Sequence, residues 1–266
     1  MFKKLAKYYH NEIRPLFFIP VFWGKLHEGE YLHVINTCFN LDYNSYDYIP
    51  RDLYKNPEWL EGRFVLFEKY CLPSMMSQTD KNFLWLINVH KDTPEEYKQK
   101  FREYQNLCPQ LRITYATTTI DYSNNLRNFV RNDAPKKEYL VTTRLDSDDA
   151  LACDYIENIH KHLYKGLGYF IDFNYGYIYD AENKLVHHTK FRRNPFVSRV
   201  EKTVELRTVH MAPHDKINQA GFVLTIKDKR HPMWAQVIHG TNMINKVDGD
   251  LQQDRTDFDK RFKIKE

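Results

Sequence analysis

The sequence lacks the motifs of several common enzyme classes. No Gly-x-x-x-x-Gly-Lys-Ser/Thr loop is present, so P-loop ATPase chemistry is unsupported. No Gly-x-Gly-x-x-Gly follows the first predicted strand, which argues against a dinucleotide-binding Rossmann domain. The 4 cysteines form no Cys-x-x-Cys pair, which excludes zinc ribbons and thioredoxin chemistry. We therefore expect buried, reduced thiols in a cytosolic protein.

Long hydrophobic runs are also missing. The apolar stretch Leu16–Trp23 contains a proline and is far shorter than the roughly 20 residues that span a bilayer. Residues 1–13 are basic and amphipathic, without the apolar core of a signal peptide. Such a segment either docks on its own domain or lies on an anionic membrane surface. We expect a cytoplasmic protein in which residues 1–23 are the segment that could contact the inner face of the membrane.

Neither sign of charge is in large excess. The formal net charge of +4 permits anionic ligands but does not indicate a nucleic-acid groove, so we expect no nucleic-acid partner. The 19 Tyr and 17 Phe are sufficient for a large core in a chain of 266 residues, which argues against disorder over most of its length. No repeat, low-complexity tract or Gly/Ser linker divides the chain.

The chain alternates between predicted strands and predicted helices. Apolar and β-branched runs predict buried strands at Tyr31–Phe39, Phe83–Val89, Leu111–Ala116, Tyr139–Leu145 and Gly166–Phe173. Helical signals between them predict helices at Glu58–Met76, Thr93–Leu107, Ser123–Asn132 and from Asp149 or Cys153 to Tyr164. Pro73 is expected to kink or divide the first helix. Such alternation implies a parallel sheet with right-handed crossovers, and ligands bind beyond the carboxyl ends of its strands.

The pattern loosens in the second half of the chain. Gly176–Asp180 and Leu185–His188 indicate a hairpin, and Phe222–Ile226 indicates another strand. Residues 246–266 are rich in charge and poor in apolar material, which predicts a solvated or mobile end. The predicted fold class is α/β: a single domain with a mostly parallel, Rossmann-like sheet flanked by helices and a more irregular second half.

Three carboxylates directly follow the fourth predicted strand, at Asp146, Asp148 and Asp149. Negative charge at this density raises the cost of ionising each group, and a bound cation removes that cost. Aspartate oxygens suit hard ions such as Mg²⁺ or Mn²⁺. The alternative is a solvated turn that caps the next helix. The position at the carboxyl edge of a parallel sheet favours the cation site.

Nucleotide diphosphates are the natural partners of such an ion, which bridges their oxygens and neutralises the charge of the leaving group. A sugar transfer from a nucleotide-sugar needs a metal, basic residues for the phosphates and a general base. A metal-dependent phosphohydrolase or nuclease could use the same aspartates, but it requires a second acidic cluster that the sequence does not show at this density. A non-catalytic carbohydrate-binding relative is a third interpretation.

The strand that ends in Asp-x-Asp resembles those of the GT-A fold glycosyltransferases, and the chain is most similar to a bacterial family of rhamnosyltransferases. The resembling segments are His33–Leu41, Phe64–Phe83, Thr143–Leu151 and Trp234–Asn242. The resemblance implies a GT-A-like fold and a metal-dependent glycosyltransferase. It also implies a nucleotide-sugar donor, with rhamnose as the leading sugar, and a glycan or glycolipid acceptor in surface polysaccharide synthesis. The cofactor would be Mn²⁺ or Mg²⁺.

The residue pattern and the resemblance together predict three parts in the chain. Residues 1–30 would be an N-terminal extension, formed by a basic amphipathic helix and an apolar segment. Residues 31–245 would be the GT-A-like domain, whose nucleotide-binding half ends at about residue 150 and is followed by the acceptor-side half. Residues 246–266 would be the charged C-terminal tail.

Roles for individual residues follow from the resemblance. Asp148 would bind the metal, Asp146 the ribose or the ion, and His239 would be a second protein ligand, although a lone histidine can equally be structural. The other candidates for nucleotide-sugar binding are Asn40, Arg63, Asp92, Arg127 and Arg144. Arg127 lies in a Leu-Arg-Asn sequence that resembles the family's Ala-Arg-Asn, but it could also be an ordinary helix-surface arginine. Cys38 stands where the family has an arginine, which weakens any phosphate role at the first strand.

A transferase that inverts the anomeric centre needs a base for the acceptor hydroxyl. His210, His214 and Asp215 cluster in Thr-Val-His-Met-Ala-Pro-His-Asp, and Asp215 is our candidate for the catalytic base. The alternative is a loop whose polar residues cap the following helix.

Overall fold

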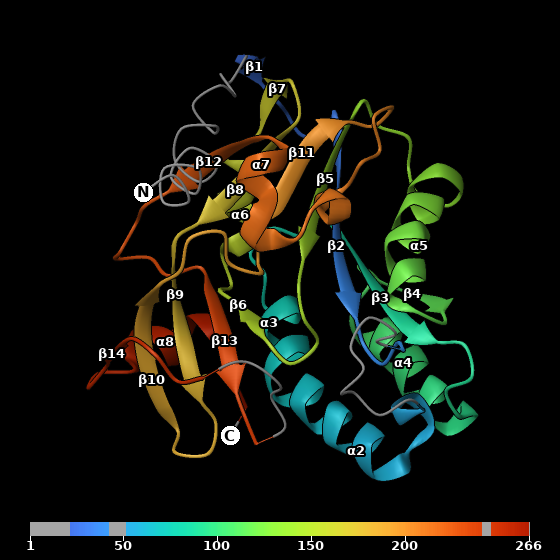
Figure 1. The fold of residues 1–266 in the computed structure, drawn as a ribbon, viewed down its shortest axis with the longest axis vertical. Helices are drawn as coiled ribbons and strands as arrows, with labels where there is room; N and C mark the ends of the chain where they lie inside the picture. Colours follow the sequence, from blue (N-terminus) through green and yellow to red (C-terminus); the bar gives the residue numbers. More distant parts are fainter. Residues whose placement is uncertain (1–21, 43–51, 241–245, 266) are drawn as a thin grey trace, which may run out of the picture.

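The computed structural model describes residues 22–42, 52–240 and 246–265, so the expected N-terminal helix lies outside the described residues (Figure 1). A seven-stranded sheet has the order β12-β8-β11-β5-β2-β3-β4. Its strands are β2 (Tyr31–Cys38), β3 (Leu84–His90), β4 (Leu111–Ala116), β5 (Tyr139–Arg144), β8 (Tyr169–Phe173), β11 (Ser198–Lys202) and β12 (Phe222–Ile226). Only β11 runs antiparallel to its neighbours in this sheet. The predicted α/β class, with a mostly parallel sheet flanked by helices, is confirmed.

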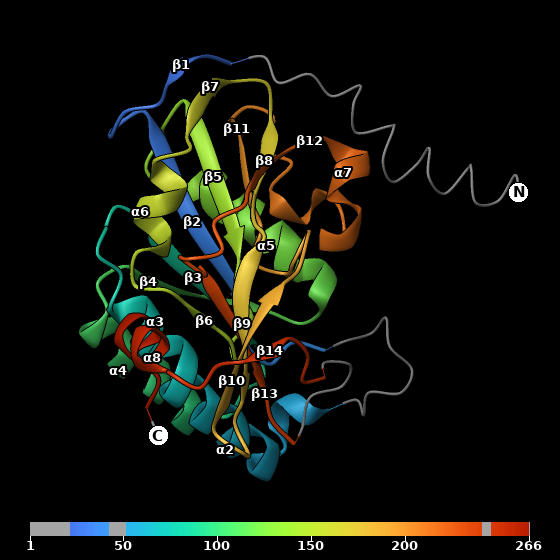
Figure 2. The ribbon, with the colours of Figure 1, turned by 90° about the vertical axis from the view of Figure 1, so that its left-hand side faces the viewer.

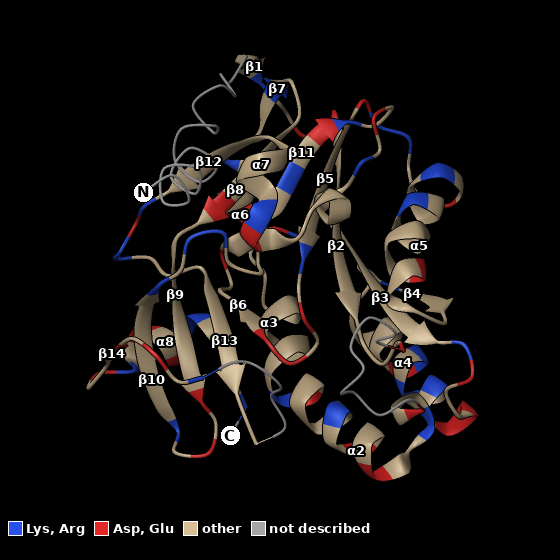
Figure 3. Cartoon of the chain, in the orientation of Figure 1, with Lys and Arg blue, Asp and Glu red and all other residues tan. Residues whose placement is uncertain are grey.

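Helices cover both faces of this sheet (Figures 1 and 2). They are α2 (Pro57–Leu66), α3 (Leu72–Met76), α4 (Glu95–Leu107), α5 (Thr119–Asn132), α6 (Tyr155–His160) and α7 (Ile217–Ala220). On one face, Ile35 belongs to the large core that includes residues of α2, α3, α4 and α6. On the other face, Val34 packs with Leu126 and Val130 of α5. Strands buried on both faces need apolar residues at nearly every position, and β2 and β3 accordingly carry no charged residue (Figure 3).

A second sheet has the order β14-β10-β9-β13-β6. Its strands are β6 (Ala150–Leu151), β9 (Tyr175–Asp180), β10 (Leu185–Lys190), β13 (Trp234–Ile238) and β14 (Asp250–Leu251). The predicted hairpin is confirmed as β9 and β10. Trp234 packs directly on Gly176, where an added Cβ would lie 2.1 Å from the indole, so only glycine leaves room for that ring. Strand β13, which carries Trp234, pairs with β9 on one edge and with β6 on the other.

Two shorter features complete the chain. Strand β1 (Phe22–Lys25) pairs with β7 (Tyr164–Gly166). The helical segment around Pro73 is continuous but contains a π-helical turn at Phe67–Cys71. Because Pro73 has no N–H, the carbonyl of Lys69 four residues earlier lacks its helical partner, and the backbone N–H of Lys265 donates to it at 2.9 Å. The predicted interruption is therefore a π-helical turn and not a break.

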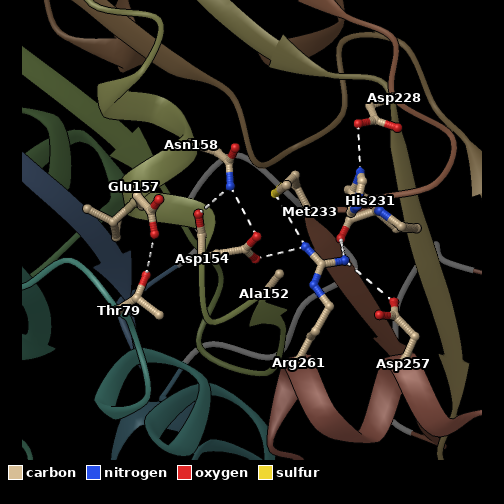
Figure 4. A network of polar contacts seen from close by, with 12 residues as sticks. Thr79, Ala152, Asp154, Glu157, Asn158, Asp228, His231, Met233, Asp257 and Arg261 are labelled. Carbon is tan, nitrogen blue, oxygen red and sulfur yellow. Dashed lines mark hydrogen bonds and ion pairs between the residues drawn. The ribbon is translucent and has the colours of Figure 1, made fainter.

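The C-terminal segment departs from the sequence expectation. Residues Thr256–Phe262 form α8, and Phe258 and Phe262 are buried in the main core. Arg261 anchors this helix: it donates to the carbonyl of Pro232 at 2.9 Å and pairs with Asp154 at 2.8 Å (Figure 4). The expectation of a solvated tail is wrong for this helix, because its two phenylalanines, four residues apart, form an apolar face.

Two helix starts also differ from the prediction. Helix α5 begins at Thr119, four residues before the predicted Ser123, because Thr118 and Asp121 form a capping box ahead of it. The helix expected from Asp149 or Cys153 begins only at Tyr155, since β6 follows the acidic turn. Within the described residues, no helix has the length and hydropathy of a membrane span.

Candidate active site

The acidic residues lie in the turn between β5 and β6, at the carboxyl edge of the main sheet. The turn is closed by the N–H of Asp149, which donates to the carbonyl of Asp146 at 3.3 Å. The N–H of Leu145 donates to the carbonyl of Asn36 on β2, which fixes the end of β5. Each of the three carboxylates then meets a different environment.

Asp148 is held by two side chains from distant parts of the chain. Its Oδ2 accepts from Arg63 of α2 at 2.9 Å and lies 3.1 Å from Nε2 of His239, which follows β13. Arg63 also donates to the hydroxyl of Ser147. Burial raises the pKa of Asp148, but the charge of Arg63 and the hydrogen bond with His239 outweigh this effect and hold the pKa below its usual range. Asp148 is therefore ionised at neutral pH.

Asp149 points into the protein instead. It is 4% exposed, and its Oδ1 accepts from the N–H of Val237 on β13 at 2.8 Å. Burial and the neighbouring charges of Asp148 and Asp146 raise its pKa well above the usual range, which favours the neutral carboxylic acid. The alternative interpretation, a solvated turn that caps the next helix, is wrong for Asp149, because its buried carboxyl group joins the acidic turn to β13.

Asp146 forms the other side of the site. It pairs with Arg144 at 2.8 Å, and both side chains remain about one third exposed. His210 lies near this pair, and its Nε2 accepts from the amide of Asn36 at 2.9 Å, which assigns its proton to Nδ1. Burial and the charges of Arg144 and Arg127 lower the pKa of His210 to about 3. A neutral imidazole therefore lies beside Arg144.

The remaining predicted residues lie around this edge. Asn40 is buried; its amide donates to Thr93 at 2.8 Å and its Oδ1 accepts from the N–H of His90, so it ties the ends of β2 and β3 together. Asp92 lies exposed beyond β3. Arg127 on α5 donates to the backbone carbonyls that precede the Val209–Met211 turn.

The predicted base also lies on the surface. Asp215 is exposed in the short His214–Lys216 turn, where Nδ1 of His214 hydrogen-bonds the carbonyl of Arg193 at 2.6 Å. Burial lowers the pKa of His214, and the charges of Arg144 and Asp146 also act on it, which indicates that His214 lies near the Asp146 side of the site. The structure thus joins Arg63 and His239 to Asp148, and Arg144 to Asp146.

Sequence reasoning missed two asparagines that organise the site. Asn36 on β2 and Asn88 on β3 are both fully buried, and the amide of Asn88 donates to Oδ1 of Asn36 at 2.8 Å. Asn36 in turn holds His210. The sequence does contain a signal for both residues. A polar side chain inside an otherwise apolar parallel strand is costly unless it is hydrogen-bonded, so each asparagine indicates a specific partner.

Asp148 and His239 have the spacing of two ligands of one metal ion. Two ligands of one ion with bonds of roughly 2.1 Å lie about 3 Å apart, which is the spacing of Asp148 Oδ2 and His239 Nε2. Within the described part of the chain, no group of three His, Cys, Asp or Glu side chains is arranged to hold an ion. A cation held by this pair would therefore have to take its remaining ligands from a bound molecule or from water.

The family model described as "Putative rhamnosyl transferase" matches residues 38–250. The chain belongs to this family. The region matched by the rhamnosyl transferase family extends from the end of β2 to β14 and contains the acidic turn, Arg63 and His239. No curated protein matches the sequence.

Among solved structures, those of S. aureus TarS are similar to this member of the rhamnosyl transferase family. The crystal structure of TarS 1–349 is 10% identical with a TM-score of 0.45, over 77% of this chain and 60% of that one. The structure of TarS 1–349 in complex with UDP is 11% identical with a TM-score of 0.43, over 78% and 60%. The chain therefore spans less than two thirds of the length of these solved structures.

Proposed function

We propose that the protein is a glycosyltransferase that moves a sugar from a nucleotide-sugar donor to a glycan or glycolipid acceptor. The observation that carries the proposal is the contact of Asp148 with both Arg63 and His239 at the carboxyl edge of a parallel sheet, in a chain of the rhamnosyl transferase family. The family description supports rhamnose as the donated sugar. We also propose that the product of the transfer is a surface polysaccharide.

Asp148 and His239 are the residues that would hold Mn²⁺ or Mg²⁺. Such an ion, when bound with a diphosphate, neutralises the charge that develops on the leaving group. Carboxylate suits both ions, whereas an imidazole ligand favours Mn²⁺ over Mg²⁺. Arg63 adds a fixed positive charge at the same place, because Asp148 and Ser147 orient its guanidinium. A guanidinium held in this way is suited to a phosphate oxygen.

The Asp146 side of the turn would receive the nucleotide. Arg144 and Asp146 are partly exposed, so they offer a cation for a phosphate and a carboxylate for a ribose hydroxyl. Asp215 is the proposed base that takes the proton of the acceptor hydroxyl. The alternative is a two-metal hydrolase, which would need a second set of ligands in addition to Asp148 and His239.

The test is a thermal-shift titration of the protein with nucleoside diphosphates and nucleotide-sugars. Ligand at 100 times its dissociation constant adds about 2.7 kcal/mol of stability, which for a chain of this size raises Tm by roughly 5–10 °C. We expect that rise with Mn²⁺ or Mg²⁺ and not with EDTA. Asp148→Asn should lose the ion-dependent rise, whereas Asp228→Asn, an exposed control outside the site, should keep it. An unchanged ion-dependent rise in Asp148→Asn would reject the metal site.

A further inference from the structure

A groove of about 570 Å³ lies between α2 and the chain that follows β13. Trp59, Gly62, Arg63 and Leu66 line it from α2 at a spacing of three or four residues, which places them on one face of the helix. His239 and Gly240 line the opposite side. The volume lies within the usual range for small-molecule sites. Because Arg63 and His239 both contact Asp148, the groove opens onto the proposed reaction centre.

The chemistry of the lining does not suit another phosphate. Among the described residues that line it, Arg63 is the one Lys or Arg side chain, and Glu58 adds a negative charge. Arg63 lies 5.8 Å from the ring of Trp59 and is already paired with Asp148. The apolar surface comes from Trp59, Leu66 and Val65, which is 47% exposed. Such a groove suits a neutral ligand with one apolar face and polar edges.

A pyranose ring has this character, because its axial C–H groups form an apolar face and its hydroxyls lie at the edge. We propose that the groove binds the sugar ring of the acceptor, with its apolar face on Trp59 and its hydroxyls toward Asn56 and Glu58. This proposal rests on the glycosyltransferase function and names where the acceptor lies. The acceptor oxygen then forms the new bond to the anomeric carbon while the bond from that carbon to the diphosphate breaks. The diphosphate leaves with the electron pair, and the hydroxyl proton passes to the base.

Gly62 provides a way to block the groove without disturbing the fold. A Cβ added at Gly62 meets no atom within 4 Å, and Gly62 lines the groove, so a larger side chain can be introduced at its wall. Glycine inside a helix is about 1 kcal/mol less favourable than alanine, so replacement should also stabilise α2. Gly62→Leu therefore fills the groove, and Trp59→Ala removes its platform. Trp23→Ala is the matched control, because Trp23 is 56% exposed on β1, away from the groove.

The probes are methyl α-rhamnopyranoside, methyl α-glucopyranoside and methyl α-galactopyranoside, titrated by saturation-transfer NMR in the presence of UDP and Mn²⁺. We expect at least one probe to bind the wild type and Trp23→Ala equally, and to bind Gly62→Leu and Trp59→Ala at least tenfold more weakly. The nucleotide-dependent rise in Tm should persist in both groove variants, because the proposed nucleotide site meets the groove only at Arg63 and His239, which both variants keep.

Three results would overturn the proposal: no probe binds the wild type, a folded Gly62→Leu binds the probe as the wild type does, or the folded groove variants lose the nucleotide-dependent rise in Tm. The last result would assign the groove to the donor. The proposed function fails by a separate result, which is the absence of any nucleotide-dependent rise in the wild type.

Discussion

Nε2 of His239 lies 3.1 Å from Oδ2 of Asp148, although 91 positions of sequence separate the two residues. The contact depends on β13, which pairs with β6 immediately after the acidic turn and with β9 on its other edge. Asp148 could be chosen from the sequence because it follows a buried strand. Its partner could be chosen only through resemblance, since no local pattern around His239 marks it as a ligand.

Replacing His239 should weaken the binding of Mn²⁺. His239→Ala removes the nitrogen donor next to Asp148, so we expect at least a tenfold loss of affinity for Mn²⁺ in the presence of a nucleoside diphosphate. Electron paramagnetic resonance of free Mn²⁺ measures this loss directly. His231→Ala, an exposed histidine paired with Asp228, is the control. Equal affinities of the two variants would remove His239 from the metal site.

Asp149 should matter for stability rather than for ligand binding. Asp149→Ala removes the carboxyl oxygen to which the buried N–H of Val237 donates, and the loss of one partner of a buried hydrogen bond typically costs about 1–3 kcal/mol. Asp149→Asn keeps a carbonyl oxygen in the same place and should cost less than about 1 kcal/mol, since the native group is favoured in its neutral form. Urea denaturation compares the two variants. If the asparagine variant is as unstable as the alanine variant, the negative charge is needed after all.

The centre of the parallel sheet could be predicted because β2, β3 and β5 are buried along nearly their whole length and are therefore rich in apolar and β-branched residues. Leu111–Ala116 and Phe222–Ile226 were predicted with the bounds that the structure shows. The role of Asp149 could not be predicted, because it depends on pairing between β6 and β13. Helix α8 was missed because the charges in that segment obscured Phe258 and Phe262, although their spacing was a usable signal.

The candidate base can be tested by its effect on turnover. Removal of a general base usually lowers the rate by about 10²–10⁴-fold, so Asp215→Asn should lower kcat by at least about 100-fold. The nucleotide-dependent rise in Tm should persist, because Asp215→Asn leaves the pair of Arg144 and Asp146 unchanged. If Asp215→Asn keeps full kcat while His214→Gln loses it, the base is His214, whose other ring nitrogen is fixed on the carbonyl of Arg193.

Stability should fall as the pH falls below about 6.5, because of a buried pair of histidines. Nδ1 of His33 lies 2.9 Å from Nε2 of His160, and Nε2 of His33 lies 2.8 Å from the hydroxyl of Thr143. Burial lowers the pKa of His33 well below its usual range, and burial also lowers that of His160 despite the nearby carboxylate of Asp80. Both histidines are therefore neutral in the folded chain and take up protons mainly on unfolding.

The direction in which stability changes with pH follows from this difference in protonation. The unfolded chain binds protons near pH 6.5 and the folded chain does not, so the stabilising contribution is complete above that pH and is lost below it. Each histidine contributes at most about 1.4 kcal/mol per pH unit to the slope. Urea denaturation between pH 8 and pH 5 should show a shallower slope in His33→Gln than in the wild type. His231→Gln, on the surface, should keep the wild-type slope, and an equal slope in all three proteins would contradict this origin.

The position of His239 also sets the order in which the site can assemble during synthesis. Ribosomes add roughly 5–20 residues per second, so about 5–20 s separate the emergence of Asp148 from that of His239. During that interval Asp148 has no histidine to meet and Asp149 has no β13 backbone to bind. A nascent chain therefore carries an incomplete cation site, and capture of the ion in the proposed manner must wait until β13 has docked between β6 and β9.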